Sequence, residues 1–162
     1  MKIGIMADSH DNLPMISRAL ELFQREGTEV IIHAGDFVAP FAVKLLLRFP
    51  GKVCAVFGNN DGEKQGIQET GLDVQSPPRR LALGGRTFII AHRAEQLENV
   101  SSGADVLVFG HSHRASIEGR SPLLVNPGEC GGWLTGSATA AVLDTRLLEV
   151  RIVKLRQEGG SE

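Results

Sequence analysis

The sequence lacks the features that would place the protein in a membrane or on nucleic acid. No apolar run approaches the ~18 residues of a membrane span. The opening residues, MKIGIMADSH, do not show the charged, apolar and small-residue regions of a signal peptide in succession. A formal net charge of −2 provides no general attraction for nucleic acid or for anionic lipid. We therefore expect a cytoplasmic protein with neither a membrane nor a nucleic-acid partner.

Cysteines and linkers are also scarce. The only two cysteines, Cys54 and Cys130, lack the spacing of a CxxC motif, and in a cytoplasmic protein we expect both to be free structural thiols. No low-complexity block divides the 162 residues, a length that suits one domain with a substantial core. We predict a single domain over 1–156, followed by a frayed tail, QEGGSE, at 157–162.

The hydrophobic pattern indicates an α/β protein. The first half alternates apolar runs with amphipathic stretches, which predicts strands at 2–8, 29–36 and 52–59 and helices at 12–27 and 40–49. Such alternation favours parallel strands joined by right-handed crossovers. The second half predicts a hairpin over 79–92, a short helix at 93–102, a strand at 104–111, and short strands near 114–118, 122–126, 138–144 and 147–155.

Five of these strands end in residues that can bind a metal ion. In VIIHAGD, VCAVFGN and VLVFGH an apolar strand is followed by one glycine and then by Asp36, Asn59 or His111. The strand at 2–8 ends at Asp8, and the strand that ends TFIIAH carries His92. Functional crevices of α/β sheets lie outside the carboxyl ends of the strands. These side chains are therefore expected to share one site.

The spacing of the candidates strengthens this reading. Asp8 and His10 are two residues apart, as are His111 and His113, so each pair can address one side of the chain, roughly 6–7 Å apart. A single such aspartate could equally be a helix cap, and a single histidine a core residue. The full candidate set is Asp8, His10, Asp36, Asn59, His92, His111 and His113. Seven oxygen and nitrogen donors without a thiolate suit two ions of Mn, Ni, Fe, Zn or Co, about 3.5–4 Å apart.

The ordered motifs DSH (8–10), GDF (35–37), GNND (58–61), AH (91–92), GHSH (110–113) and NPGE (126–129) resemble those of the calcineurin-like metallophosphoesterases. The chain is most similar to the small single-domain prokaryotic phosphodiesterases of that superfamily. The resemblance implies a four-layer αββα sandwich, in which helices flank two mixed β-sheets. It also implies a dinuclear metal site, with manganese as the first choice, at the carboxyl ends of the strands.

The same resemblance implies a ligand set and a mechanism. One ion would be held by Asp8, His10, Asp36 and His113, and the other by Asp36, Asn59, His92 and His111, with Asp36 bridging. A metal-bridging hydroxide would then attack phosphorus in a small phosphoester substrate, with no covalent enzyme intermediate.

Two positions depart from the family pattern. Many relatives carry a histidine at the position of Asn60, which can donate a hydrogen bond but cannot titrate. The usual Gly-His after the ligand histidine is replaced by Arg93-Ala94, and an arginine is a good phosphate clamp but a poor general acid. Asn60 and Arg93 are thus the candidate catalytic residues, although Arg93 could simply be solvated. His33 and Asp61 are expected to support the ligands from behind.

Other functions remain open at this point. The retromer subunit resembles these enzymes but works as a non-catalytic binding scaffold, and ECGGWLTG (129–136), with the only tryptophan, could form a contact surface or a homo-oligomer interface. Within the enzyme class, a phosphomonoesterase is the alternative to a phosphodiesterase.

Overall fold

The computed structural model describes residues 1–156, so the tail predicted at 157–162 lies outside the described residues. The first half contains β1 (Lys2–Met6), α1 (Leu13–Arg25), β2 (Val30–His33), α2 (Pro40–Leu46), β3 (Lys52–Val56), α3 (Lys64–Glu69) and β4 (Asp73–Gln75). The second half contains β5 (Arg79–Leu83), β6 (Arg86–Ile90), the 3₁₀ turn η1 (Ala94–Leu97), β7 (Val106–Val108), β8 (Ser116–Glu118), β9 (Leu123–Asn126), β10 (Thr139–Asp144) and β11 (Glu149–Lys154).

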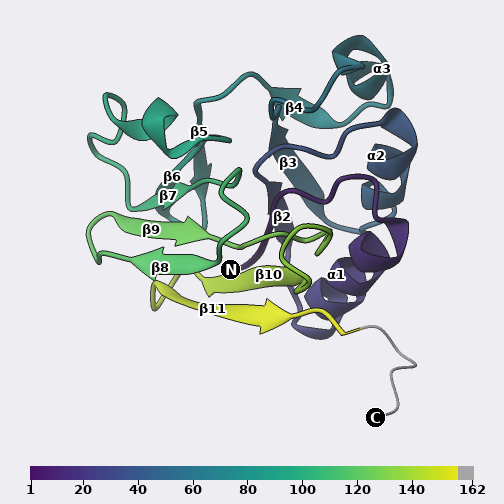
Figure 1. Cartoon of the computed structure of the whole chain (residues 1–162). Coiled ribbons are helices and arrows are strands. Elements are labelled where there is room, and N and C mark those ends of the chain that lie inside the picture. Colours follow the sequence, from purple (N-terminus) through teal and green to yellow (C-terminus); the bar gives the residue numbers. More distant parts are fainter. Residues whose placement is uncertain (157–162) are drawn as a thin grey trace.

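The strands form two mixed sheets that face each other (Figure 1). The first has the order β11-β10-β1-β2-β3-β4, and its strands β1 to β4 are parallel, as the alternation of strands and helices predicts. The second has the order β5-β6-β7-β9-β8, with β6, β7 and β9 parallel. The hairpin predicted over 79–92 is present as the antiparallel pair β5 and β6.

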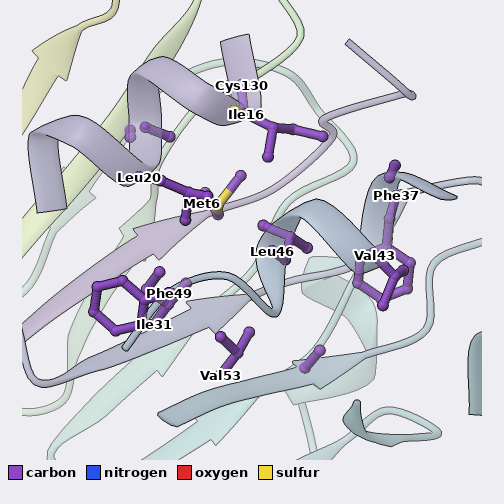
Figure 2. Packing of buried hydrophobic residues seen from close by; sticks show 14 of the residues in the cluster. Met6, Ile16, Leu20, Ile31, Phe37, Val43, Leu46, Phe49, Val53 and Cys130 are labelled. Atoms are coloured by element: carbon purple, nitrogen blue, oxygen red, sulfur yellow. The ribbon is translucent and has the colours of Figure 1, made fainter. Parts of the chain in front are cut away.

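Three apolar clusters separate the layers. Helices α1 and α2 pack on the outer face of the first sheet, where Ile16 and Leu46 contact the residues of β1 and β2 that face away from the second sheet (Figure 2). Alternate residues of β1, Ile3 and Ile5, point the other way and pack between the sheets with Phe88. The third and smallest cluster lies on the outer face of the second sheet, under η1.

The predicted sandwich of two mixed sheets flanked by helices is confirmed, although its helical layers are unequal. The helix predicted at 93–102 is only the single turn η1, so the fourth layer is thin in the described residues. Helix α3 and strand β4 were not predicted, because α3 is one short segment, KQGIQE, with a single buried apolar residue, Ile67. Within residues 1–156, no helix combines the length and apolar character needed to cross a membrane.

Parallel pairing brings the strand ends to a common edge. β1, β2 and β3 run side by side in the first sheet, and β6 and β7 run side by side in the second. The loops after these five strands carry all seven candidate ligands. The two cysteines lie elsewhere in the core, buried and unpaired, as expected.

Candidate metal centre

The loops at this edge hold unusual backbone conformations. Five of the seven candidate ligands have a positive φ, which side-chain-bearing residues seldom adopt: Asp8 (52°), His10 (41°), Asp36 (61°), His111 (64°) and His113 (60°). Left-handed conformations at such residues carry strain and cluster at functional sites. The chain therefore turns sharply at the strand ends in order to direct these side chains to one place.

Glycines at two strand ends permit the close approach of these loops. A Cβ atom on Gly58 would collide with the carboxylate of Asp36 and lie 2.5 Å from its backbone nitrogen. A Cβ atom on Gly110 would lie 2.8 Å from Asp8 Oδ2. Each glycine that precedes a candidate ligand thus leaves room for a carboxylate contributed by another strand.

Asp8, His10 and His113 form the first group of candidate ligands. One donor atom from each lies within 4.8 Å of the others. Asp8 Oδ1 is 3.6 Å from His113 Nε2 and 4.0 Å from His10 Nε2, and the two imidazole rings stack with centroids 5.3 Å apart. Asp8 is fully buried and each histidine is partly exposed, so the group opens toward solvent on its histidine side.

Asp8, Asp36 and His92 form a second group, also with donor atoms within 4.8 Å. Asp36 Oδ2 lies 3.4 Å from His92 Nε2 and 3.7 Å from His10 Nε2. The carboxylate of Asp36 thus lies between a histidine of the first group and a histidine of the second. This is the position that a bridging ligand would occupy.

Contacts behind the rings of His92 and His113 orient the two imidazoles relative to the centre. His92 Nδ1 lies 2.9 Å from the carbonyl oxygen of Ala34, which can only accept, so Nδ1 carries the proton. His113 Nδ1 lies 3.3 Å from Glu129 Oε1, although the two atoms do not form a hydrogen bond. When its only ring proton is the one on Nδ1, His92 directs the lone pair of Nε2 inward, which is the arrangement typical of histidine ligands of metals.

Burial and neighbouring groups shift the pKa values of the candidate ligands in opposite directions. Burial raises the pKa of Asp8 to about 6, against the influence of His113. Burial would also raise the pKa of Asp36, but hydrogen bonds from His92 and Asn60 hold it well below its usual range. Burial lowers the pKa of His10, whereas Asp36 overcomes burial and raises the pKa of His92. Asp36 therefore stays ionised as the anionic focus of the site.

This donor set fits divalent cations. Among the described residues, the buried atoms Asp8 Oδ1 and His10 Nε2 have no hydrogen-bond partner. Both are electron-pair donors when the imidazole Nε2 is unprotonated, and so are Asp36 Oδ2 and His92 Nε2, which face each other. A cation placed between such converging donor atoms would satisfy them. The residues present therefore suit the metal ions that the sequence predicts.

The remaining predicted residues lie around these two groups. Asn59 Oδ1 is 3.0 Å from His92 Nε2, so both can reach one position. The ring of His111 lies edge-on to His92, with centroids 5.1 Å apart, and its backbone nitrogen donates to Asp8 Oδ2. Asn60 donates from its backbone and its side chain to the two oxygens of Asp36. Arg93 follows His92 directly and is exposed.

The two residues predicted to support the ligands are buried beside them. Asp61 accepts hydrogen bonds from three backbone nitrogens, those of Asp36 (3.0 Å), Val38 (2.8 Å) and Gly58 (2.6 Å), and so ties the loops after β2 and β3 together. His33 accepts from the backbone nitrogen of Gly35 at Nδ1, so its Nε2 donates to the hydroxyl of Ser9. This second contact joins the end of β2 to the loop after β1.

Sequence reasoning missed Glu129, which ends the NPGE motif. Its carboxylate is fully buried and accepts hydrogen bonds from the backbone nitrogens of Leu134 and Thr135 and from the Thr135 hydroxyl, besides contacting His113. The available signal was the pattern itself, since Glu129 follows a strand and a glycine as the ligands do. The same loop places exposed Trp133 at the rim, where its Nε1 donates to the carbonyl oxygen of His10.

Comparison with known proteins agrees with this geometry. Residues 1–147 match the model of the calcineurin-like phosphoesterase superfamily domain. The chain is 40% identical to phosphodiesterase MJ0936 of Methanocaldococcus jannaschii, over 96% of this chain and 99% of that protein. It is 29% identical to phosphodiesterase YfcE of Escherichia coli K12, over 93% and 91% of the two chains. The solved structure of an archaeal phosphodiesterase superimposes with a TM-score of 0.88 at 37% identity, over 96% of this chain and 100% of that chain.

Proposed function

This chain belongs to the calcineurin-like phosphoesterase superfamily and is a metal-dependent phosphodiesterase; we propose that its catalytic centre is the carboxylate–histidine cluster at the strand ends. The observation that carries the proposal is the convergence of candidate ligand atoms around Asp8 and Asp36, where Asp8 Oδ1 and His10 Nε2 have no hydrogen-bond partner among the described residues.

Two divalent ions would suit the donors, with Asp36 shared between them. We assign Asp8, His10, Asp36 and His113 to one ion, and Asp36, Asn59, His92 and His111 to the other. Manganese is our first candidate among the Mn, Ni, Fe, Zn and Co ions that oxygen and imidazole donors without a thiolate suit. We place the protein in the cytoplasm, in keeping with its two free buried thiols.

When bound, the two ions would lower the pKa of a water molecule and neutralise charge on the substrate phosphate. The chain supplies the geometry. Asp61 ties the loops after β2 and β3 together through backbone contacts, and His33 links the end of β2 to Ser9 in the loop after β1. We assign Asn60 and Arg93 the role of donating hydrogen bonds to phosphate oxygens, because both carry N–H donors beside the ligand set and neither belongs to it.

The leaving group must depart with little help from Asn60. An amide side chain cannot donate a full proton, and general acid catalysis is typically worth ~10²–10⁴-fold. We therefore expect hydrolysis to be fastest for esters of acidic alcohols such as 4-nitrophenol, and slow for alkyl esters. Equal rates for aryl and alkyl diesters would contradict the role given to Asn60.

The test is hydrolysis by protein stripped of metal and then supplied with Mn, Ni, Zn, Fe or Mg. Turnover of bis(4-nitrophenyl) phosphate should appear only with added metal and should exceed turnover of 4-nitrophenyl phosphate. Asp36→Asn should abolish it, whereas Asp144→Asn, at the end of β10, should not. Faster hydrolysis of the monoester would favour a phosphomonoesterase, and tight partner binding with no turnover under any metal would favour a scaffold.

A further inference from the structure

A hollow beside the candidate metal centre shares Arg93 with the chemistry described above and includes residues to which that chemistry gives no role. Its volume is about 310 Å³, and one wall is formed by Asn59 and His92, two of the candidate ligands. Its lining also includes Lys64, from the first turn of α3, and Arg93, from the segment between β6 and η1. A substrate group attached to a phosphate at the metal centre could extend directly into this space.

The lining of the hollow is cationic. Lys64 and Arg93 both line it, and no carboxylate does. Within residues 1–156 neither of these side chains forms an ion pair with an acidic residue. The ammonium of Lys64 lies 5.5 Å from the centroid of the Phe57 ring, which also lines the hollow, so a cation–π contact keeps the charge at this wall. Two positive charges therefore face the hollow without an internal counter-charge.

The backbone beneath Arg93 is fixed relative to the metal centre. Gln96 Oε1 accepts hydrogen bonds from the backbone nitrogens of His92 (3.1 Å) and Arg93 (2.9 Å). The residue that carries the guanidinium is thus tied to the candidate ligand before it. A planar guanidinium attached to a fixed backbone suits a carboxylate or phosphate group, which it can bind through two parallel hydrogen bonds.

We propose that this hollow, lined by Lys64 and Arg93, binds a second anionic group of the substrate. The preferred substrates would be phosphodiesters in which the ester arm that stays on phosphorus carries a carboxylate or a further phosphate. This inference rests on the proposed function and specifies its substrate class. It also gives Lys64, which the sequence analysis did not single out, the same role as Arg93 in binding this anionic group.

Three 4-nitrophenyl aryl phosphodiesters test the proposal. The retained aryl group carries a 4-carbamoyl, a 4-carboxylate or a 4-phosphonate substituent, so the leaving group is the same in all three. In each reaction water adds to phosphorus, the bond to 4-nitrophenolate breaks, and nitrophenolate absorbance reports the rate. We expect kcat/KM for the carboxylate to exceed that for the carbamoyl ester about 3- to 30-fold, the phosphonate to be at least as good, and the preference to shrink in high salt.

Substitutions in the lining test whether the hollow causes the preference for the carboxylate ester. Lys64→Gln should lower the carboxylate-to-carbamoyl ratio about 2- to 5-fold, and Lys64→Gln with Arg93→Gln should bring it close to one. Lys64→Arg should retain the preference, as should Lys44→Gln on α2, which removes a charge outside the hollow. A wild-type ratio near one, or an unchanged ratio in the double variant, overturns the subsite but leaves the phosphodiesterase intact. No metal-dependent hydrolysis of any probe overturns both.

Discussion

Glu129→Gln separates a ligand-positioning role from a purely structural one. The substitution keeps the size of the side chain but replaces one carboxylate oxygen with an amide that cannot accept. The native carboxylate accepts from Leu134 and Thr135 and faces His113 Nδ1 at 3.3 Å. Outer hydrogen-bond partners of metal ligands are typically worth 10- to 100-fold in affinity, so the free energy of metal binding should weaken by about 1.4–2.7 kcal/mol.

Calorimetric titration of Mn²⁺ into metal-stripped protein measures this change directly. Thr135→Val is the matched control, because it removes a hydrogen bond to Glu129 and leaves the contact with His113. It should lower the melting temperature by a few degrees, about 2–4 °C per kcal/mol in a chain of this size, without the loss of metal affinity. Equal Mn²⁺ affinity in wild type and Glu129→Gln would refute the positioning role.

Three further substitutions probe the loops at the strand ends. Gly58→Ala should abolish Mn²⁺ binding in the same titration because its Cβ atom would displace the Asp36 carboxylate, whereas Gly62→Ala, with nothing within 4 Å of its Cβ position, should bind normally. Asp61→Asn should destabilise the protein by about 1–3 kcal/mol in urea unfolding, since one amide oxygen cannot satisfy three backbone donors; an unchanged midpoint would contradict this. Burial lowers the pKa of His33 to about 3, so the unfolded chain binds an extra proton between pH 6.5 and 3 and the folded state loses stability as the pH falls. Metal-free wild type should therefore lose about 2 kcal/mol relative to His33→Gln between pH 7.5 and 5, and parallel pH profiles of the two proteins would argue against this.

Local patterns in the sequence predict the sheets and the cluster well. The apolar strands β1, β2 and β3 are evident from their composition, and the glycine after a strand marks the loops that converge. Asp8, Asp36 and His92 were expected to share a site, and their donor atoms lie within 4.8 Å. These successes follow from parallel topology, because parallel strands that begin at one edge must end at the other.

What the sequence could not predict depends on contacts between distant segments. The position of Glu129 after a strand and a glycine is visible in the sequence, but its contact with His113 is not. Lys64 stands out only once α3 has placed it in the same lining as Arg93. Helix α3 itself is too short for its periodicity to be read, since a single buried Ile67 anchors it. The helix predicted over 93–102 shrinks to one turn, where the Gln96 side chain accepts from the preceding backbone.

The number and position of bound ions test the central claim most directly. A crystal structure of the Mn²⁺-loaded protein, with anomalous scattering recorded at the manganese edge, should show two peaks about 3.5–4 Å apart with the Asp36 carboxylate between them. A single peak, or two peaks that do not share Asp36, would contradict the dinuclear centre proposed for this phosphodiesterase.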